Sequence, residues 1–206
     1  MFDNKAKPVK PLEQDNKFLN KMTQEEHLKE MGRASFHTGN YDQAIEYFKK
    51  AIELKPDFAE AWELIGFTYF FRGEYSTAIE YYKRAIRHDP NCAEAYYDMG
   101  NAYCSLENYD TAIRCYEKAI ELKPYFVDEV YYNMGNTYQY MRIYDTAIEC
   151  YEKAIKYKPD YLEAYYNMGN AYLQIGNYDV AIRYIKKTAQ LGSEPARQWL
   201  MSNGLL

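Results

Sequence analysis

The feature that most constrains the fold of this chain is a sequence pattern that recurs about every 34 residues. A charged residue followed by proline marks the end of each copy, at Lys55-Pro56, Asp89-Pro90, Lys123-Pro124 and Lys158-Pro159. A block ending in glycine follows each pair, at Ala61–Gly66, Ala95–Gly100, Val130–Gly135 and Ala164–Gly169. With an earlier copy that ends at Pro56, the chain divides into five units, about 25–58, 59–92, 93–127, 128–161 and 162–193.

Each unit contains two stretches whose apolar residues recur at a spacing near 3.6, which indicates two helices. In the third unit, Met99, Gly100 and Tyr103 share one face of the first stretch. Ala112 and Tyr116 share one face of the second. Neither helix can bury its apolar face alone, so the units must stack on one another. The sequence therefore predicts an all-α fold in which each repeat contacts only its neighbours.

This pattern resembles the tetratricopeptide repeat, a helix–turn–helix unit of about 34 residues. The resemblance implies a right-handed α-α superhelical solenoid over residues 23–206. Two departures are local. Glu107 and Arg142 stand where three other units have glycine at the end of the first helix, and Val127 is an extra residue between the third and fourth units. We expect a longer connection at Val127.

The last unit of a solenoid needs a cover for its apolar face. We predict a capping helix over residues 194–203, with Ser193 as N-cap and Pro195 in the first turn. Its apolar stripe consists of Ala196, Trp199 and Leu200, and Gly204 ends it. At the other end, Thr23 and Glu26 have the spacing of a capping box that opens the first unit.

Residues 1–22 form a basic arm, with five lysines against three acidic residues, in a chain of net charge -5. Three interpretations of the arm stay open: a short helix, a frayed segment, or a non-native extension. Charged residues and Pro8 stand where a secretory signal needs an apolar run, and no run approaches the length needed to cross a bilayer. We therefore expect a cytoplasmic protein that does not insert into membranes.

Motifs of catalysis and of metal or cofactor binding are missing from the sequence. The three histidines are far apart, the four cysteines form no CxxC pair, and there is no phosphate-binding glycine loop. Cys115 and Cys150 occupy equivalent places in successive units, which is too far apart for a disulfide. We expect no enzymatic activity, no metal and no cofactor.

The resemblance implies that the first helix of each unit lines a concave groove, at the second, fifth, sixth, ninth, twelfth and thirteenth positions. Phe67, Phe70 and Phe71 occupy three of these positions in the second unit and predict an apolar interaction patch. The alternative is that the arm, or the curvature of the solenoid, covers these rings.

Asparagine and tyrosine recur in the groove of the later units. The predicted ladder consists of Tyr97, Asn101, Tyr132, Asn133, Asn136, Tyr166, Asn167 and Asn170. Because an amide both donates and accepts, it can pair with the backbone of a peptide, and tyrosine adds a rigid contact surface. The arrangement is similar to the asparagine ladder of the repeats in O-linked N-acetylglucosamine transferase. The alternative is that asparagine is simply common at these places in the family, and that an asparagine beside glycine bonds within its own unit.

The groove of the first unit is basic, and the edge of the groove is acidic. Lys29 and Arg33 are candidate peptide contacts. Lys29 alone fits the carboxylate clamp of family members that bind chaperone tails, because Glu94 and Asp98 stand where that clamp needs basic residues. Glutamate occupies the second position of every unit and forms an acidic row, at Glu26, Glu60, Glu94, Glu129 and Glu163.

These features favour a scaffold or adaptor that binds a peptide segment of a protein partner in the concave groove. Two alternatives belong to other classes. The basic arm is able to mediate self-association into a homo-oligomer, since the remainder of the chain is acidic. Helical-repeat proteins also bind RNA, but such binding needs a basic surface. The acidic groove edge therefore argues against a nucleic-acid partner.

Overall fold

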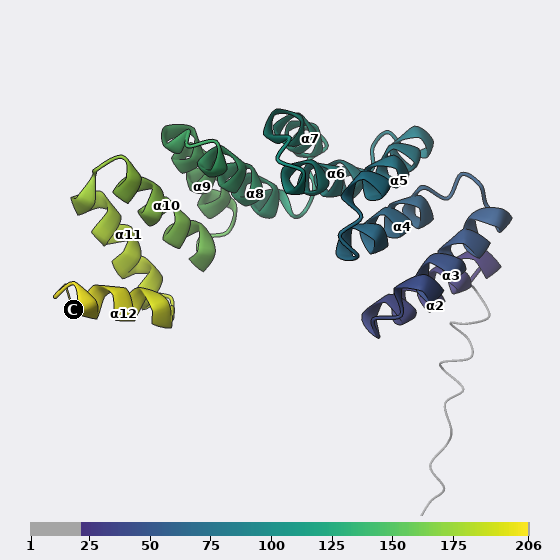
Figure 1. Ribbon diagram of the computed structural model, residues 1–206, viewed down its shortest axis with the longest axis horizontal. Helices are drawn as coiled ribbons and strands as arrows, with labels where there is room; N and C mark the ends of the chain where they lie inside the picture. Colours follow the sequence, from purple (N-terminus) through teal and green to yellow (C-terminus); the bar gives the residue numbers. More distant parts are fainter. Residues whose placement is uncertain (1–21, 206) are drawn as a thin grey trace, which may run out of the picture.

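The computed structural model describes residues 22–205, and within this range the chain forms eleven α-helices arranged as an arch (Figure 1). The helices are α2 (Gln24–His37), α3 (Tyr41–Leu54), α4 (Ala59–Phe71), α5 (Tyr75–His88), α6 (Ala93–Ser105), α7 (Tyr109–Glu121), α8 (Val127–Tyr140), α9 (Tyr144–Tyr157), α10 (Leu162–Gln174), α11 (Tyr178–Gln190) and α12 (Glu194–Ser202). The first ten pack as five sequential hairpins, and each hairpin packs against the next. The predicted all-α solenoid is confirmed.

The predicted helix caps at the two ends are confirmed. The Thr23 side chain accepts a hydrogen bond from the Glu26 backbone amide, and the Glu26 carboxylate accepts one from the Thr23 amide. At the other end the Ser193 hydroxyl caps α12, and Pro195 lies in its first turn. The prediction for the basic arm lies outside the described residues, apart from Met22.

One backbone position ends the first helix of every repeat in the left-handed conformation. Gly39, Gly73 and Gly176 have φ of 78° there. Glu107 and Arg142 adopt the same conformation, with φ of 58° and 61°. This conformation costs a residue with a Cβ on the order of 1 kcal/mol. The turn geometry is therefore set by the repeat and does not depend on glycine.

The connection between the third and fourth repeats is longer than the others, as Val127 predicts. It spans residues 122–126, whereas the equivalent connections span 55–58, 89–92 and 158–161. Lys123 takes up the extra residue with a positive φ of 53°. The longer connection leaves Tyr125 90% exposed while Phe126 is buried at the start of α8.

The core of each repeat depends on a glycine of the first helix that faces a large side chain of the second. Gly100 lies against the ring of Tyr116, and Gly135 lies against the ring of Tyr151. A Cβ at either glycine would lie 2.6 Å from the nearest ring atom. Fully buried alanines flank this contact in every repeat. The small residues let the paired helices approach, and the ring fills the space beside them.

The capping helix buries the stripe predicted from the sequence. Ala196 and Leu200 are fully buried against Ile185 and Ala189 of α11, and Trp199 packs at the edge of this cluster. The left-handed Gly204 follows the helix end. Among residues 22–205, no helix combines the length and the apolar character that crossing a bilayer requires.

We predict that Gly100→Ala destabilises the fold. Its added methyl group would collide with the Tyr116 ring, which is buried and held by a hydrogen bond through its hydroxyl group. The overpacking costs about 1–3 kcal/mol, against roughly 1 kcal/mol gained in helix propensity. We expect the free energy of unfolding, measured in urea, to fall by about 1–2 kcal/mol.

The matched control is Gly169→Ala in the fifth repeat. Here the added Cβ meets Cγ1 of Ile185 at 3.0 Å, a looser contact than the 2.6 Å to the ring of Tyr116. We expect this variant to lose less than half of what Gly100→Ala loses. Equal losses would contradict the role of the ring contact.

Candidate functional site

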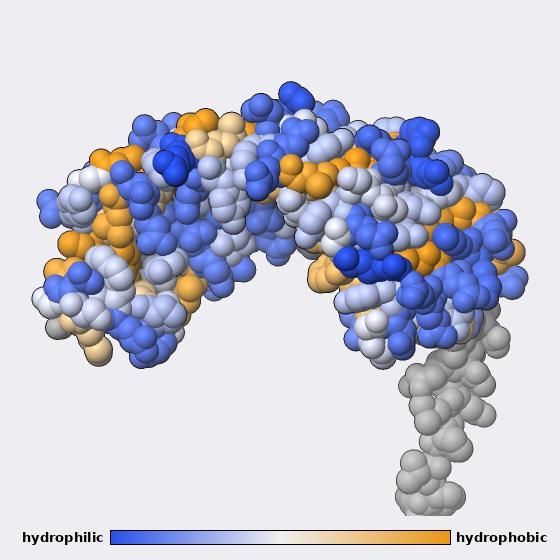
Figure 2. Space-filling view, in the orientation of Figure 1, coloured by the Kyte–Doolittle hydropathy of each residue, from blue (hydrophilic) through white to orange (hydrophobic). Residues whose placement is uncertain are grey.

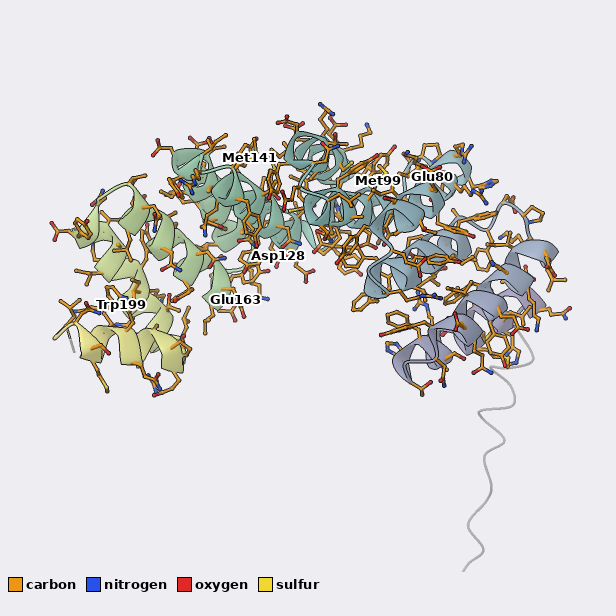
Figure 3. All side chains as sticks on the ribbon, in the orientation of Figure 1. Glu80, Met99, Asp128, Met141, Glu163 and Trp199 are labelled. Carbon is orange, nitrogen blue, oxygen red and sulfur yellow. The ribbon has the colours of Figure 1, made fainter. Side chains whose placement is uncertain are left out.

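The concave side of the arch is the candidate functional site, and α2, α4, α6, α8 and α10 supply its side chains. Figure 2 shows the hollow beneath the arch. In Figure 3, Asp128 and Glu163, in the first turns of α8 and α10, lie along this concave side. Glu80 and Met141 lie on the outer side.

Hydrogen bonds link the asparagines and tyrosines of the groove between the third and fourth repeats. The Tyr116 hydroxyl of α7 donates to Asn101 Oδ1 at 2.8 Å. Asn133 Nδ2 of α8 donates to the same Asn101 oxygen at 3.1 Å and to the Tyr97 hydroxyl at 2.8 Å. These four residues form one unit of what we call the polar ladder.

A second unit of the polar ladder joins the fourth and fifth repeats. The Tyr151 hydroxyl donates to Asn136 Oδ1 at 2.9 Å. Asn167 Nδ2 donates to Asn136 Oδ1 at 2.8 Å and to the Tyr132 hydroxyl at 3.2 Å. The ladder goes no further, because Ile185 stands in place of the tyrosine in the fifth repeat.

The bonds of Asn101 to Tyr116 and of Asn136 to Tyr151 lie within one repeat, as the alternative for these amides expects, whereas the bonds of Asn133 and Asn167 cross to the preceding repeat. The polar ladder uses only part of each amide. It engages Oδ1 of Asn101 and Asn136 and Nδ2 of Asn133 and Asn167. The opposite ends of these amides take no part in it. Asn101, Asn133 and Asn136 also line an open pocket of about 530 Å³, together with Phe70, Cys104, Ser105, Glu107, Tyr109, Tyr116 and Tyr140.

The junction between the second and third repeats differs from the ladder at three of the four equivalent positions. Phe67 replaces the ladder asparagine, Glu63 replaces the tyrosine of the first helix, and Asp98 replaces the donor asparagine. Glu63 is only 9% exposed, and its carboxyl group shares a hydrogen bond with that of Asp98. We call Glu63 and Asp98 the carboxyl pair.

Burial dominates the electrostatics of the carboxyl pair. Removal from water raises the pKa of Glu63 well above its usual range, and the neighbouring charge of Asp98 adds to this shift. Burial likewise raises the pKa of Asp98 to about 7, with a further contribution from the charge of Glu94. Two carboxylates this close cannot both ionise without cost, so the pair holds one proton in common near neutral pH.

The hydroxyl group of Tyr82 is left without a hydrogen-bond partner within residues 22–205. Tyr82 is the equivalent of Tyr116 and Tyr151, but Phe67 offers it no acceptor. Its side chain is fully buried, and burial followed by the charges of Asp98 and Glu63 raises its pKa. The hydroxyl group therefore lies within electrostatic reach of the carboxyl pair.

The two basic residues predicted to contact a peptide are engaged by a glutamate of the next repeat. Lys29 Nζ lies 2.8 Å from Glu60 Oε2, and Arg33 Nη2 lies 2.7 Å from Glu60 Oε1. Partly exposed pairs of this kind contribute about 1 kcal/mol or less. A ligand that uses Lys29 or Arg33 must therefore compete with Glu60.

Phe71 is the exposed member of the predicted phenylalanine patch. It is 53% exposed, and its ring centroid lies 4.8 Å from that of Phe67 and 5.3 Å from that of Phe36 in α2. Phe70 is partly buried: it packs against Tyr75 and the core between the second and third repeats, and it also lines the open pocket of about 530 Å³. We call Phe36, Phe67 and Phe71 the aromatic patch; Phe36, from the first repeat, joins it through this contact between repeats.

The described residues hold no group of three or more His, Cys, Asp or Glu side chains able to bind a metal ion. All four cysteines are free thiols within this part of the chain. Cys115 and Cys150 are buried, and burial raises the pKa of each to about 11, which keeps both protonated and unreactive. Cys104 is partly buried, and its Sγ lies 3.5 Å from Thr137 Oγ1.

Comparison with known families identifies tetratricopeptide repeats along most of the chain. One model of this repeat matches residues 32–71, 68–106 and 144–176. Two further tetratricopeptide repeat models match residues 93–126 and 162–194. A search of curated proteins found no match.

Solved structures with the same architecture include three that cover most of both chains. The crystal structure of MamA is 34% identical, covers 81% of this chain and 96% of its own, and has a TM-score of 0.72. PilF of Pseudomonas aeruginosa is 22% identical, covers 88% of this chain and 82% of its own, and has a TM-score of 0.78. YrrB, described as having an unusual peptide-binding site, is 20% identical, covers 87% of this chain and 91% of its own, and has a TM-score of 0.68.

We predict that Asp98→Asn stabilises the protein above neutral pH. Because folding raises the pKa of Asp98, the folded state binds the proton more tightly than the unfolded state does. The resulting stability is fully present below about pH 4 and is lost as the pH rises through about 7. The amide avoids this loss, so the free energy of unfolding at pH 8 should rise by about 1–3 kcal/mol.

The matched reverse variant is Asn133→Asp, which introduces a carboxyl group at the equivalent position of the polar ladder. We expect it to lose stability as the pH rises over the same interval, as measured by urea unfolding at pH 4.5, 6 and 8. A wild-type protein whose stability does not fall over this interval would contradict the assignment of a shared proton.

Proposed function

Because the chain belongs to the tetratricopeptide repeat family, we propose that it is a scaffold that holds a peptide segment of a partner protein in its concave groove. Proteins of this family are protein-interaction scaffolds and are typically non-catalytic. The observation that carries the proposal is the aromatic patch on the concave side, where Phe71 exposes half of its surface. An exposed apolar cluster in a polar surround marks an interaction site.

Two further features of the groove support a peptide as the ligand. The aromatic patch borders a slot of about 190 Å³, lined in part by Phe36, Leu64 and Phe67, which is suited to an apolar side chain. Farther along the groove, the amide ends outside the polar ladder have the donors and acceptors that match a peptide backbone. YrrB, which shares the fold, is described as having a peptide-binding site.

We infer that the partner is a protein and that the protein works in the cytoplasm without a cofactor. A nucleic-acid partner would require lysine and arginine for phosphate contacts. The groove instead carries the exposed Glu94, Glu129 and Glu163, and Glu60 engages the two basic residues of the first repeat.

Self-association is the alternative function, in which the basic arm of residues 1–22 occupies the acidic groove of a second copy. The complementary charges of arm and groove favour it. Light scattering over a range of protein concentrations distinguishes the two proposals. A mass that rises with concentration supports self-association, and a monomer mass throughout excludes it.

We predict that Phe71→Ser weakens peptide binding by at least about tenfold, because a buried aromatic anchor in a binding site contributes more than about 1–2 kcal/mol. The ligands are peptides selected against the full chain from a display library, and the affinity is measured by fluorescence anisotropy. Because the Phe71 side chain is largely exposed in the free protein, helicity by circular dichroism should stay unchanged.

Leu54→Ala is the matched control, since Leu54 is 50% exposed on α3, a second helix outside the groove. We expect the selected peptides to bind this variant as they bind the wild type. If Phe71→Ser binds with unchanged affinity, the groove is not the binding surface.

A further inference from the structure

We infer that the junction between the second and third repeats is a receptor site for a basic side chain, lysine or arginine, of the bound segment. The inference rests on the proposed function, because it assumes that a peptide occupies the groove, and it specifies what that peptide must carry. The carboxyl pair of Glu63 and Asp98, the aromatic walls beside it and the unused hydroxyl group of Tyr82 together support it.

The pocket at this junction has the shape and composition that a basic side chain requires. Its volume is about 300 Å³, and its carboxyl groups come from three successive repeats. They belong to Glu63, Glu94, Asp98 and Glu129. The remaining walls are largely apolar or aromatic and include Leu64, Phe67, Tyr97, Tyr125 and Phe126. A basic side chain has an apolar stem and a charged end, so it matches both parts.

The rings of this pocket are placed to contact a cation. Tyr97 and Phe126 lie with their centroids 5.3 Å apart, and Tyr125 meets Phe126 edge to face at 5.1 Å. Tyr125 is the residue that the longer connection leaves exposed. An ammonium or guanidinium group over such rings gains cation–π attraction in addition to its attraction to the carboxylates.

The unpartnered hydroxyl group of Tyr82 is a second observation, independent of the pocket lining, that supports a ligand at this junction. In the two ladder units the equivalent hydroxyl groups of Tyr116 and Tyr151 donate to a residue of the groove. The equivalent Tyr82 side chain is fully buried, and its hydroxyl group has no hydrogen-bond partner within the described part of the chain. A buried hydroxyl group without a partner is costly, and its oxygen is able to accept a hydrogen bond from an ammonium or guanidinium group.

The protein's own cations neutralise this pocket only in part, through the charge of Arg33, which opposes the rise that burial causes in the pKa of Glu63. Arg33 lines it, but the guanidinium Nη2 is bound to Glu60 at 2.7 Å. Lys29 is bound to the same carboxylate at 2.8 Å. Full pairing of Glu63 and Asp98 therefore requires a cation from the ligand. A metal ion is a poor occupant, because no set of metal-binding side chains is present among residues 22–205.

Binding of the cation is linked to release of one proton. In the free protein Glu63 and Asp98 share a proton; when a cation enters, that proton leaves to solvent and both carboxylates pair with the ligand. The titratable and charged groups that face the pair are Arg33 from α2, Glu60 from α4, Tyr82 from α5, Cys92 before α6, Glu94 and Tyr97 from α6, and Glu129 from α8. Affinity for a basic ligand therefore increases as the pH rises toward neutrality.

The test uses the full chain and two small probes that share an alkyl stem, only one of which carries an ammonium group. N-acetyl-lysine methylamide carries the ammonium group, and N-acetyl-norleucine methylamide has the same kind of stem without it. The carboxyl carbons of Glu63 and Asp98 are followed by NMR during pH titration with each probe. We expect the lysine probe to lower the titration midpoint of Asp98 by about one pH unit, and norleucine to leave it unchanged.

Two variants make the test specific. Asp98→Asn retains the shape of the residue and matches the amide of the ladder units, and we expect it to weaken binding of the lysine probe at least about tenfold. Asp145→Asn, at an exposed position in the first turn of α9, should bind the lysine probe like the wild type. If Asp98→Asn fails to fold, Glu63→Gln takes its place with the same expected loss.

The outcomes separate this inference from the proposed function. An unmoved Asp98 midpoint with the lysine probe, an equal effect of norleucine, or undiminished binding by the folded carboxyl variant would overturn the basic-side-chain site. If peptides selected against the groove still bind and lose affinity in Phe71→Ser, the scaffold function then stands without it. A lowered midpoint with lysine alone supports the site, even if no peptide depends on Phe71.

Discussion

The contact between a glycine of the first helix and a ring of the second organises both the interior and the groove of this protein. In the third repeat the ring of Tyr116 rests on Gly100, and its hydroxyl group reaches Asn101 on the concave side. The same side chain therefore fills the core and begins the hydrogen-bond network of the binding surface. Because packing fixes the ring, the groove asparagine is held in place before any ligand arrives, which lowers the entropic cost of binding.

Stacking of identical cores lets the groove vary from repeat to repeat. The groove begins with the aromatic patch, continues through the carboxyl pair, and ends in the polar ladder. All three lie at groove positions of the first helices, and the ladder adds tyrosines of the second helices. Behind them, a glycine of the first helix and a buried alanine of the second recur in every repeat. Changes at exposed groove positions such as Phe71 therefore leave the fold intact. The ladder asparagines and the carboxyl pair are exceptions. Asn101 and Asn136 accept hydrogen bonds from buried core tyrosines, and ionisation of the carboxyl pair weakens the contact between two repeats.

The periodic pattern was sufficient to predict the helices, the caps and the longer connection, because each depends on residues close in the sequence. Thr23 and Glu26 are three residues apart. The extra Val127 lengthens one loop however the repeats pack against each other. The polar ladder joins residues about one repeat apart, such as Tyr97 and Asn133. The recurrence of Tyr116 and Tyr151 beside the asparagines was the signal that could have revealed it. The carboxyl pair was harder to foresee, because Glu63 read as an ordinary groove position until its burial was known.

The longer connection at residues 122–126 also breaks the translational symmetry of the solenoid. Were every repeat alike, an extended ligand would find several equivalent registers and could slide from one to the next. One inserted residue places Tyr125 beside a single junction and gives the concave surface a unique landmark. A segment bound there, as we propose, would be fixed both in polarity and in register along a series of otherwise similar repeats.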